Sequence, residues 1–434
     1  MSEYSPPGVQ VDMEAEPIVC AMRVEAWLRR AARRCPGRAA VNALTYAALD
    51  EAASAGARDL HARGGRPGDR VAIALAPGED FAVALHAVWR LGASAVPVDL
   101  RDREPRTAGA RVVVDAPLTD GPDAPLVFEH DIDEPAAIIH TSGSTGPPKP
   151  VELTFGNWLW SALGSGVALG VDPDERWLCA LPLTHVGGLS IVVRSAIYAT
   201  TALVHERWDT DRVLRALRDE GVTIVSLVPT TLARALDAGL REPPALRTVL
   251  LGGAPIPPAL AERARAAGVA VTETYGLTEA CSQVTTGGPP LFCTRVRIAG
   301  DGEIVVSGPT VAGGGELRTG DLGALGEHGH LRVTGRKADT IVTGGENVAP
   351  AEVEAVLAEH PAVAEAAVHA RPDAEWGEAI VATVVLRAGA SATAEELRAH
   401  AAGRLAPYKV PKAVAFADAL PRTPSGKLVR RALA

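Results

Sequence analysis

Short apolar runs alternate with helix-length segments along much of the chain. Strands are predicted at 70–76, 93–99, 111–115, 222–228, 246–251 and 269–272. Helices are predicted at 78–91, 209–220, 230–238 and 257–267. This alternation predicts an α/β fold in which helices cover the faces of a parallel sheet. Open sheets of this kind bind ligands at the carboxyl ends of their strands, so a site is expected there.

A loop of small polar residues directly follows another apolar run, at 136–139. The loop contains Thr141, Ser142, Gly143, Ser144, Thr145, Gly146, two prolines and Lys149. Successive backbone N–H groups with nearby hydroxyls form a nest for anionic oxygen atoms, and the lysine adds a positive charge. The spacing G-x-x-G-x-x-K and the two prolines differ from the Walker pattern. We interpret the loop as a polyphosphate cradle; a flexible surface loop is the alternative.

Two further segments with ligand-like chemistry also follow predicted strands. Gly252, Gly253 and Ala254 come after the strand 246–251, and TYGLTE (274–279) comes after the strand 269–272. Because the carboxyl ends of parallel strands lie at one edge of a sheet, these segments and the loop are expected to lie together. Their agreement supports a binding site better than any one motif does.

Composition narrows the classes of protein that the chain can belong to. Its 434 residues are enough for about three core-sized units. A net charge of −9 argues against a general binder of nucleic acid or acidic membranes. The five cysteines form no C-x-x-C pair, which favours reduced thiols over a disulfide framework or a zinc site. Acidic residues precede any long apolar run, so we expect no secretory signal and a cytoplasmic protein.

The segment 153–171 carries no charge and is just long enough to raise the question of a membrane span. It contains Asn157 and four glycines, which favours a buried helix packed closely on a neighbour. We therefore expect no stable insertion into a membrane.

Lysine is scarce in this sequence. The 43 basic residues include only five lysines, at 149, 337, 409, 412 and 427. Because lysine and arginine are not interchangeable at a point-charge site, each lysine is a candidate for a chemical role.

The character of the sequence changes near residue 295. Short strands separated by glycine turns predict a small β unit, and the polar segment 335–350 is a candidate hinge. Beyond it, helices at 351–359 and 393–405 and strands at 363–369 and 379–386 predict a compact α+β unit. We therefore expect an N-terminal domain at 1–334, a hinge region at 335–350 and a C-terminal domain at 351–434.

Seven motifs carry a resemblance to a known family. In chain order they are TSGSTGPPK, LPLTH, GGAPI, ETYGLTE, RTGDLG, GRKADTIVTGGEN and PRTPSGK. Together they resemble the acyl-adenylate-forming superfamily of acyl-CoA synthetases, carrier-protein adenylation domains and luciferases. The resemblance implies a large N-terminal domain hinged to a small, mobile C-terminal domain. It also implies a reaction in two halves, in which ATP and a carboxylic acid give acyl-AMP and pyrophosphate and a thiol such as CoA then displaces AMP.

The resemblance implies roles for individual residues of the nucleotide site. The β- and γ-phosphates of ATP would be held by Thr141, Ser142, Ser144, Thr145 and Lys149. Gly252, Gly253 and Ala254 would form the floor under adenine, and Tyr275, between Thr274 and Gly276, would stack on it; a core aromatic at a strand end is the alternative. Thr278 would bond the α-phosphate or the new acyl oxygen, Glu279 would hold Mg²⁺ with Thr145, and Asp321 with Arg336 would hold the ribose.

The resemblance also implies that the C-terminal domain moves between the half-reactions. Lys427 would stabilise the negative charge that gathers between the carboxylate and the α-phosphate. The second half-reaction would replace it with the face at Gly344 and Gly345, where the thiol arrives. The hinge would lie between Lys337 and Asp339. The family often has a charged residue at the position of Ala338, so the pivot is left open.

The acid substrate is indicated by LPLTHVGGLSIVVRS at 181–195. This segment resembles the corresponding one in o-succinylbenzoate–CoA ligases of menaquinone biosynthesis. His185 would wall the acyl pocket beside Gly253, although a satisfied histidine at a helix start is the alternative. Arg194 is a lone charge in an apolar helix, which is costly unless paired. Its partner would be a second carboxylate of the substrate, or else a buried carboxylate of the protein.

Other activities stay open at this level. They are a CoA ligase for another aromatic or fatty acid, an enzyme that loads a carrier protein, a luciferase-like monooxygenase, and a nucleotide-binding regulator without catalysis. The expected partners are a small carboxylic acid, ATP and CoA, with Mg²⁺ as cofactor and no nucleic acid; a homodimer is left open.

Overall fold

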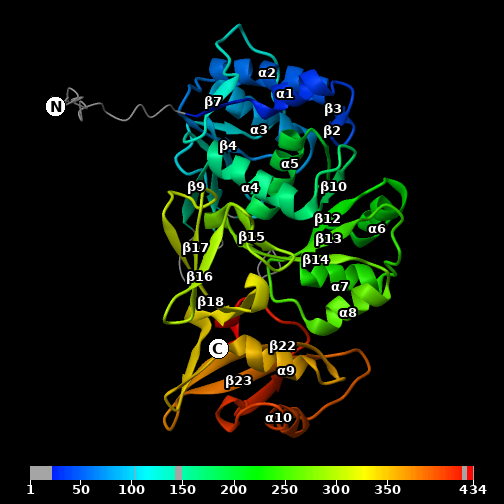
Figure 1. The fold of residues 1–434 in the computed structure, drawn as a ribbon, viewed down its shortest axis with the longest axis vertical. Helices are drawn as coiled ribbons and strands as arrows, with labels where there is room; N and C mark the ends of the chain where they lie inside the picture. Colours follow the sequence, from blue (N-terminus) through cyan, green and yellow to red (C-terminus); the bar gives the residue numbers. More distant parts are fainter. Residues whose placement is uncertain (1–21, 103, 142–148, 423–427, 434) are drawn as a thin grey trace, which may run out of the picture.

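The computed structural model describes residues 22–102, 104–141, 149–422 and 428–433. Figure 1 shows an N-terminal layer at the top, a central sheet below it, a small β unit beside that sheet, and a C-terminal domain at the bottom. Among the described residues, no helix combines the length and the apolar character that crossing a membrane requires.

The N-terminal layer is built on a five-stranded sheet in the order β6-β4-β5-β8-β9. Its strands are β4 (Arg70–Ile73), β5 (Ser94–Pro97), β6 (Val112–Val114), β8 (Pro135–His140) and β9 (Pro150–Thr154). The first four run parallel, and β9 returns antiparallel to β8. Helices α1 (Trp27–Arg34), α2 (Tyr46–Ala62) and α3 (Glu79–Leu91) belong to this layer, and so does a short ribbon of β1 (Arg23–Glu25) and β7 (Glu129–Asp131).

The central sheet has eight strands in the order β15-β14-β13-β12-β10-β11-β2-β3. They are β2 (Ala39–Val41), β3 (Leu44–Thr45), β10 (Arg176–Cys179), β11 (Thr201–Val204), β12 (Ile224–Leu227), β13 (Thr248–Leu251), β14 (Val271–Leu277) and β15 (Ser282–Thr286). Strands β2 and β10 to β14 form a parallel run. Because helices cover both of its faces, the central strands are apolar throughout rather than alternating.

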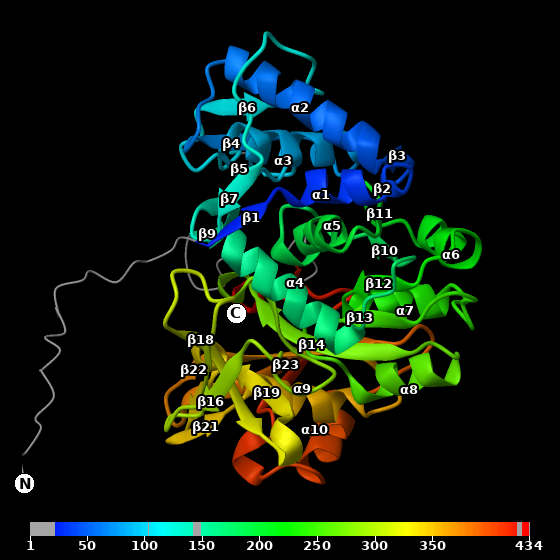
Figure 2. The ribbon, with the colours of Figure 1, turned by 45° about the horizontal axis from the view of Figure 1, so that its top comes forward.

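Two helices connect the layers. Helices α4 (Phe155–Leu169) and α5 (Val186–Tyr198) contact both the N-terminal layer and the central sheet, and Figure 2 shows them between the two. The largest apolar core is formed here, around Trp27, Trp158 and Trp177. The other face of the sheet is covered by α6 (Thr210–Asp219), α7 (Pro229–Asp237) and α8 (Pro258–Ala266), which share a second core.

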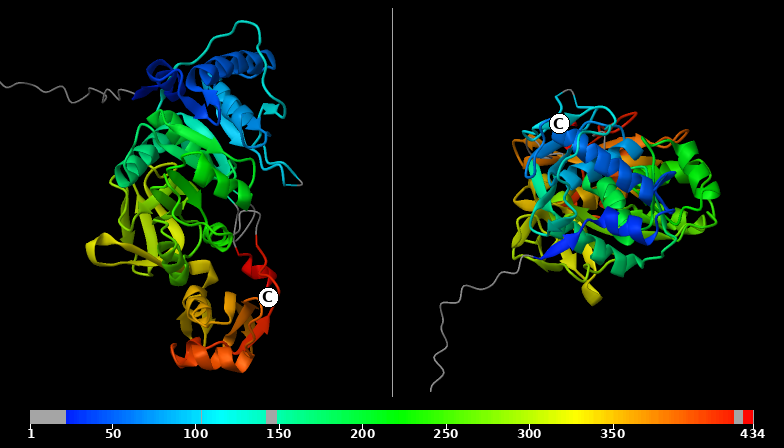
Figure 3. Two further views of the ribbon diagram at one scale, coloured as in Figure 1. Left: turned by 90° about the vertical axis from the view of Figure 1, so that its right-hand side faces the viewer. Right: turned by 90° about the horizontal axis from the view of Figure 1, so that it is seen from above.

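The last part of the chain forms two smaller units. The first is an antiparallel sheet of β16 (Arg295–Ile298), β17 (Glu303–Ser307), β18 (Glu316–Leu325) and β19 (Leu331–Arg336). The second is the C-terminal domain, with β20 (Ile341–Thr343), β21 (Glu346–Val348), α9 (Pro350–Ala358), β22 (Val363–Asp373), β23 (Gly377–Leu386), α10 (Ala394–Ala402) and β24 (Ala413–Phe416). This domain has its own core and lies apart from the rest in the left view of Figure 3.

The predicted α/β fold class is confirmed, and the elements differ from the prediction in a few places. Helix α2 was not predicted, and neither was β7, which lies in the proline- and acid-rich segment 120–134. Strand β14 continues to Leu277 instead of ending at 272. The segment 335–350 contains β20 and β21, which pair within the C-terminal sheet. That the domains rotate about this segment stays a prediction.

Candidate active site

The carboxyl end of β13 meets β14 at two of the predicted segments. A Cβ atom on Gly252 would lie 2.5 Å from the carbonyl oxygen of Thr274, so only glycine fits at this position. Gly253 has a φ of +79°, in the region that favours glycine. The exposed backbone of 253–254 therefore lies directly beside the strand that carries Tyr275. The structure brings the predicted adenine floor and the predicted stacking residue together.

Tyr275, Asp321 and Arg336 form a connected group. The Tyr275 hydroxyl donates to Oδ2 of Asp321 at 2.8 Å, and Nε of Arg336 lies 2.8 Å from Oδ1. Asp321 and Arg336 face each other because β18 and β19 pair in that register. Asp321 is buried, and burial together with this carboxylate raises the pKa of Tyr275 well above its usual value. This group joins the central sheet to the small β unit.

The turn after β14 carries Thr278 and Glu279. These residues form a short 3-10 helix, η1 (Thr278–Ala280), which ends at Cys281 in the left-handed conformation, with φ +50°. The carbonyl oxygen of Glu279 accepts a hydrogen bond from the backbone N–H of Ala312 at 2.8 Å. A Cβ on Gly276 would lie 1.6 Å from the carbonyl oxygen of Ser282, so glycine is required where the chain passes this turn.

The carboxylate of Glu279 fits a role in binding Mg²⁺. It makes no ion pair with any residue in the described parts of the chain, so its oxygen atoms are available to a hard cation. Those parts also contain no cluster of three or more histidine, cysteine, aspartate or glutamate residues that could hold a metal alone. One carboxylate with substrate phosphates is a common arrangement for Mg²⁺, which would neutralise phosphate charge when bound.

The phosphate-loop prediction falls largely outside the described residues. Ser142, Gly143, Ser144, Thr145 and Gly146 lie there, as does Lys427. The residues that flank the loop are described: the N–H of Thr141 donates to the carbonyl oxygen of Lys149 at 3.0 Å. Strand β9, which follows Lys149, contacts η1. The strand that follows the loop therefore lies beside the turn that carries Glu279.

His185 and Arg194 lie on one helix. His185 is the N-cap of α5, and its carbonyl oxygen accepts hydrogen bonds from the N–H groups of Gly188 and Leu189. Gly188 has no room for a side chain, because a Cβ would lie 2.3 Å from the carbonyl oxygen of Pro182. With a rise of about 1.5 Å per residue, Arg194 is about 13 Å further along the helix. The two residues are therefore too far apart along α5 to contact one small group together.

Arg194 is a buried cation with no carboxylate partner among the described residues. It is 2% exposed, and burial lowers the pKa of its guanidinium. Its Nη2 donates to Oγ of Ser161 at 2.9 Å, and its guanidinium carbon lies 5.9 Å from the ring centre of Trp177. Its Nε is buried and has no hydrogen-bond partner among the described residues. No described aspartate or glutamate pairs with it. The protein carboxylate considered as its alternative partner is therefore absent from the described residues.

The predicted hinge residues lie between the two domains, and the residues of the predicted thiol face lie within the C-terminal domain. Lys337 pairs with Asp301 and Glu303 of the small β unit, at 2.7 and 3.3 Å. Asp339 pairs with Arg430 near the end of the chain, at 3.3 Å. Both residues belong to a 3-10 turn, η3 (Lys337–Asp339).

Gly344 and Gly345 form the tight turn between β20 and β21, and the N–H of Gly344 donates to the carbonyl oxygen of Trp376 at 2.9 Å. Both glycines have positive φ, +58° and +85°. They lie on the sheet of the C-terminal domain, whereas the predicted adenine floor follows β13 of the central sheet.

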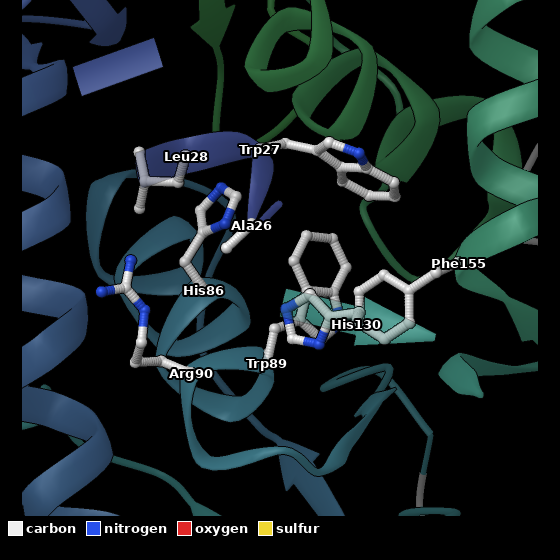
Figure 4. Close-up of a pocket in the computed structure, with 8 residues that line it drawn as sticks. All are labelled: Ala26, Trp27, Leu28, His86, Trp89, Arg90, His130 and Phe155. Atoms are coloured by element: carbon white, nitrogen blue, oxygen red, sulfur yellow. The ribbon is translucent and has the colours of Figure 1, made fainter. Parts of the chain in front are cut away.

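Figure 4 shows a small cavity elsewhere in the molecule. Its lining side chains come from the N-terminal layer and the start of α4, and they include His86, Arg90 and His130. None of the predicted site residues is among them. This cavity therefore belongs to the packing of the N-terminal layer and not to the site at the strand ends.

Family models identify the chain. The model of the AMP-binding enzyme matches residues 28–116 and 102–314, and the model of the AMP-binding enzyme C-terminal domain matches residues 352–427. The chain belongs to the AMP-binding enzyme family. Curated relatives of this AMP-binding enzyme include the 2-succinylbenzoate–CoA ligases of Bacillus licheniformis and Bacillus subtilis. Each is 37% identical, over 94% of this chain and 98% or 97% of the relative.

Solved structures agree with this assignment. The o-succinylbenzoate CoA synthetase (MenE) of Bacillus subtilis, in complex with its acyl-adenylate intermediate OSB-AMP, matches with a TM-score of 0.87 and 34% identity, over 95% of this chain and 98% of that one. The same enzyme with ATP and magnesium ion matches with a TM-score of 0.86 and 34% identity, over 94% and 99%. ATP-bound MatB from Rhodopseudomonas palustris matches with a TM-score of 0.86 and 27% identity, over 94% and 98%.

Sequence reasoning missed several residues that connect the site. Ser161 gave no signal, because a serine inside an apolar helix is unremarkable until its partner is known. Glu303 and Arg430 looked like ordinary surface charges in the sequence. In the structure, Glu303 accepts hydrogen bonds from both Arg318 and Lys337. For Arg430, the one sequence feature that could have indicated a role was the pair Arg430-Arg431, three residues after Lys427.

Proposed function

We propose that this enzyme joins 2-succinylbenzoate to CoA, consuming ATP and releasing AMP and pyrophosphate through an acyl-AMP intermediate. The curated relatives and the Bacillus subtilis structures support the reaction class and the acid. The observation that carries the choice of acid within this chain is Arg194. Burying an unpaired charge costs several kcal/mol, so such a residue is retained where a ligand supplies its counter-ion.

Arg194 selects an acid with two carboxylates. The carboxylate on the substrate ring would pair with the buried guanidinium, whose unpartnered Nε offers a second donor. The succinyl carboxylate would then remain free to attack the α-phosphorus of ATP. His185, at the start of the same helix, would line the other end of the acyl pocket.

The nucleotide would lie along the ends of β13 and β14. The backbone at Gly252 and Gly253 and the ring of Tyr275 would hold adenine, and Asp321, oriented by Tyr275 and Arg336, would accept from the ribose hydroxyls. The loop from Thr141 to Lys149 and the turn at Thr278 would hold the phosphates, with Mg²⁺ on Glu279. Lys427 would stabilise the transition state of the first half-reaction.

An acid panel tests this proposal. The wild-type enzyme, ATP, Mg²⁺ and CoA are incubated with 2-succinylbenzoate, with 4-oxo-4-phenylbutanoate (the same molecule without its ring carboxylate), with benzoate and with a fatty acid. We expect AMP, pyrophosphate and a CoA thioester, with 2-succinylbenzoate preferred. Release of ADP and orthophosphate would overturn the reaction class, and preference for a monocarboxylic acid would overturn the substrate.

Replacing Arg194 tests the residue that carries the assignment. In Arg194→Ala, the KM for 2-succinylbenzoate should rise about 10- to 100-fold, because a hydrogen-bonded ion pair contributes about 1.5–3 kcal/mol. The KM for ATP and the kinetics with 4-oxo-4-phenylbutanoate should change little. Arg263→Ala, which removes an exposed arginine of α8, is the matched control. Equal losses with both acids would show that Arg194 has only a structural role.

A further inference from the structure

The hydroxyl of Ser161 lies between two parts of the site that the sequence keeps far apart. Ser161 is fully buried in the middle of α4. Its Oγ accepts a hydrogen bond from Nη2 of Arg194 at 2.9 Å and donates one to the carbonyl oxygen of Cys281 at 2.6 Å. A hydroxyl has one proton to donate, so these two bonds fix its orientation.

We propose that Ser161 is a positioning residue that sets the acid specificity of the enzyme by fixing the guanidinium of Arg194. This inference rests on the proposed function, because it assumes that Arg194 receives the second carboxylate of the substrate. Within the described chain, Ser161 is the only side chain that accepts a hydrogen bond from Arg194. A guanidinium has five donors in a rigid fork, so one bond at Nη2 restricts where the remaining donors point.

The surroundings of Arg194 offer little else to orient it. Trp177 contacts it through its ring face, and the indole N–H donates instead to Oγ of Ser226 at 2.9 Å. The long arginine side chain has many rotamers, and only polar contacts distinguish among them in an apolar environment. Loss of the Ser161 hydroxyl would leave Arg194 charged and buried, but without a fixed direction.

The second bond of Ser161 connects Arg194 to the turn that carries Thr278 and Glu279. Cys281 and Ser282 both have positive φ, +50° and +90°, which residues other than glycine rarely adopt. The N–H of Cys281 donates to the carbonyl oxygen of Thr278, and Ser161 holds the carbonyl oxygen of Cys281. Ser161 therefore sets the position of the specificity arginine relative to the turn proposed for the α-phosphate and Mg²⁺.

The test compares two acids in variants of Ser161. In Ser161→Ala, we expect the preference for 2-succinylbenzoate over 4-oxo-4-phenylbutanoate, measured as the ratio of kcat/KM, to fall about 10-fold, mostly through the KM of the dicarboxylic acid. Ser161→Cys keeps a side chain of similar size with a weak acceptor and should shift the ratio in the same direction; it serves if the alanine variant does not fold. A merely structural role would lower kcat/KM for both acids equally and would overturn the inference.

Two further comparisons distinguish the positioning of Arg194 from a general structural role of Ser161. Ser195→Ala removes a buried hydroxyl on the helix of Arg194 that has no hydrogen-bond partner within the described part of the chain, and it should leave the ratio unchanged. In an Arg194→Ala background, Ser161→Ala should have no further effect on the ratio, because the residue that it positions is gone. A further fall in the ratio there would contradict the inference. If the wild-type enzyme shows no preference for the dicarboxylic acid, the proposed function itself fails; a preference that survives Ser161→Ala removes only the role of Ser161.

Discussion

Asp321 is held from both sides and keeps unused acceptor positions on both carboxylate oxygens. One carboxylate oxygen accepts from Tyr275 and the other pairs with Arg336. Each carboxylate oxygen can accept two hydrogen bonds, so one position on each remains for a pair of ribose hydroxyls. The group therefore orients the carboxylate without occupying it.

Removing the Tyr275 hydroxyl tests this arrangement. In Tyr275→Phe, the ring that would stack on adenine stays, but Asp321 loses one of its two orienting partners. We expect the KM for ATP to rise about 3- to 10-fold, the range of one neutral hydrogen bond, with little change in the KM for the acid. Pyrophosphate exchange at varied ATP measures this, and an effect confined to the acid would contradict the assignment.

The individual residues of the site were predictable to different degrees. Arg194 stood out because a lone charge inside an apolar segment is conspicuous in the sequence. Ser161 and Glu303 did not, because their importance lies in partners that only folding brings near. The pairing of Tyr275 with Asp321 likewise spans 46 residues and depends on how the small β unit meets the central sheet.

Among the elements, α3 and β7 enclose two neutral histidines (Figure 4). His86 of α3 has its pKa lowered to about 3 by burial and by Arg90, and His130 of β7 has its pKa lowered to about 4 by burial, by Arg90 and by Arg23. Arg90 pairs with Asp50 of α2, which offsets part of its charge. The imidazole of His130 stacks on Phe155 at 4.0 Å, so both rings are part of the packing between layers.

These histidines make the N-terminal layer sensitive to acid. In the unfolded chain, these histidines bind protons near pH 6.5, whereas in the folded protein they do so only at about pH 4 or below. Their contribution to the free energy of unfolding is therefore fully present above pH 6.5 and is lost as the pH falls from 6.5 to about 4. The loss is about 1.4 kcal/mol per pH unit for each histidine. Urea unfolding at pH 7 and pH 5 measures it, and His86→Gln should reduce the slope. An unchanged slope in this variant would contradict the assignment.

Helices and strands were easier to predict where a local apolar pattern alone determines their type and length. The strand–helix alternation was apparent because parallel strands are apolar throughout and their helices are amphipathic. Helix α2 was missed because its sequence is rich in alanine, and its apolar pattern is weak. The length of β14 depends on antiparallel pairing with β15, which continues to Leu277 and cannot be seen in the strand alone.

At the scale of the whole molecule, the connection between the domains is held by opposite charges. Lys337 pairs with Asp301 and Glu303 of the small β unit, and Asp339 pairs with Arg430 of the C-terminal domain. The intervening residue, Ala338, has no side chain capable of either contact. We expect the two domains to rotate relative to each other at this residue.

The expected movement of the C-terminal domain predicts that the two half-reactions can be separated. In Lys427→Ala, formation of acyl-AMP from acid and ATP should fall by at least about 100-fold, because the positive charge at the transition state is lost. Thioester formation from supplied acyl-AMP and CoA should remain close to that of the wild-type enzyme. Single-turnover assays of each half measure this. Lys412→Ala, on the same domain but over the ring of Trp376, is the control. Equal loss of both halves in Lys427→Ala would contradict the role of the lysine.

Because Arg194 is buried with no carboxylate partner in the described chain, we expect the lifetime of the enzyme to depend on the supply of its acid substrate. A dianion that neutralises the guanidinium binds only the native fold, and it therefore raises the free energy of unfolding in proportion to the logarithm of its concentration. In a cell short of the acid, a larger fraction of the chains would unfold and be degraded. The abundance of the protein would then follow the output of the preceding biosynthetic step without any dedicated regulator.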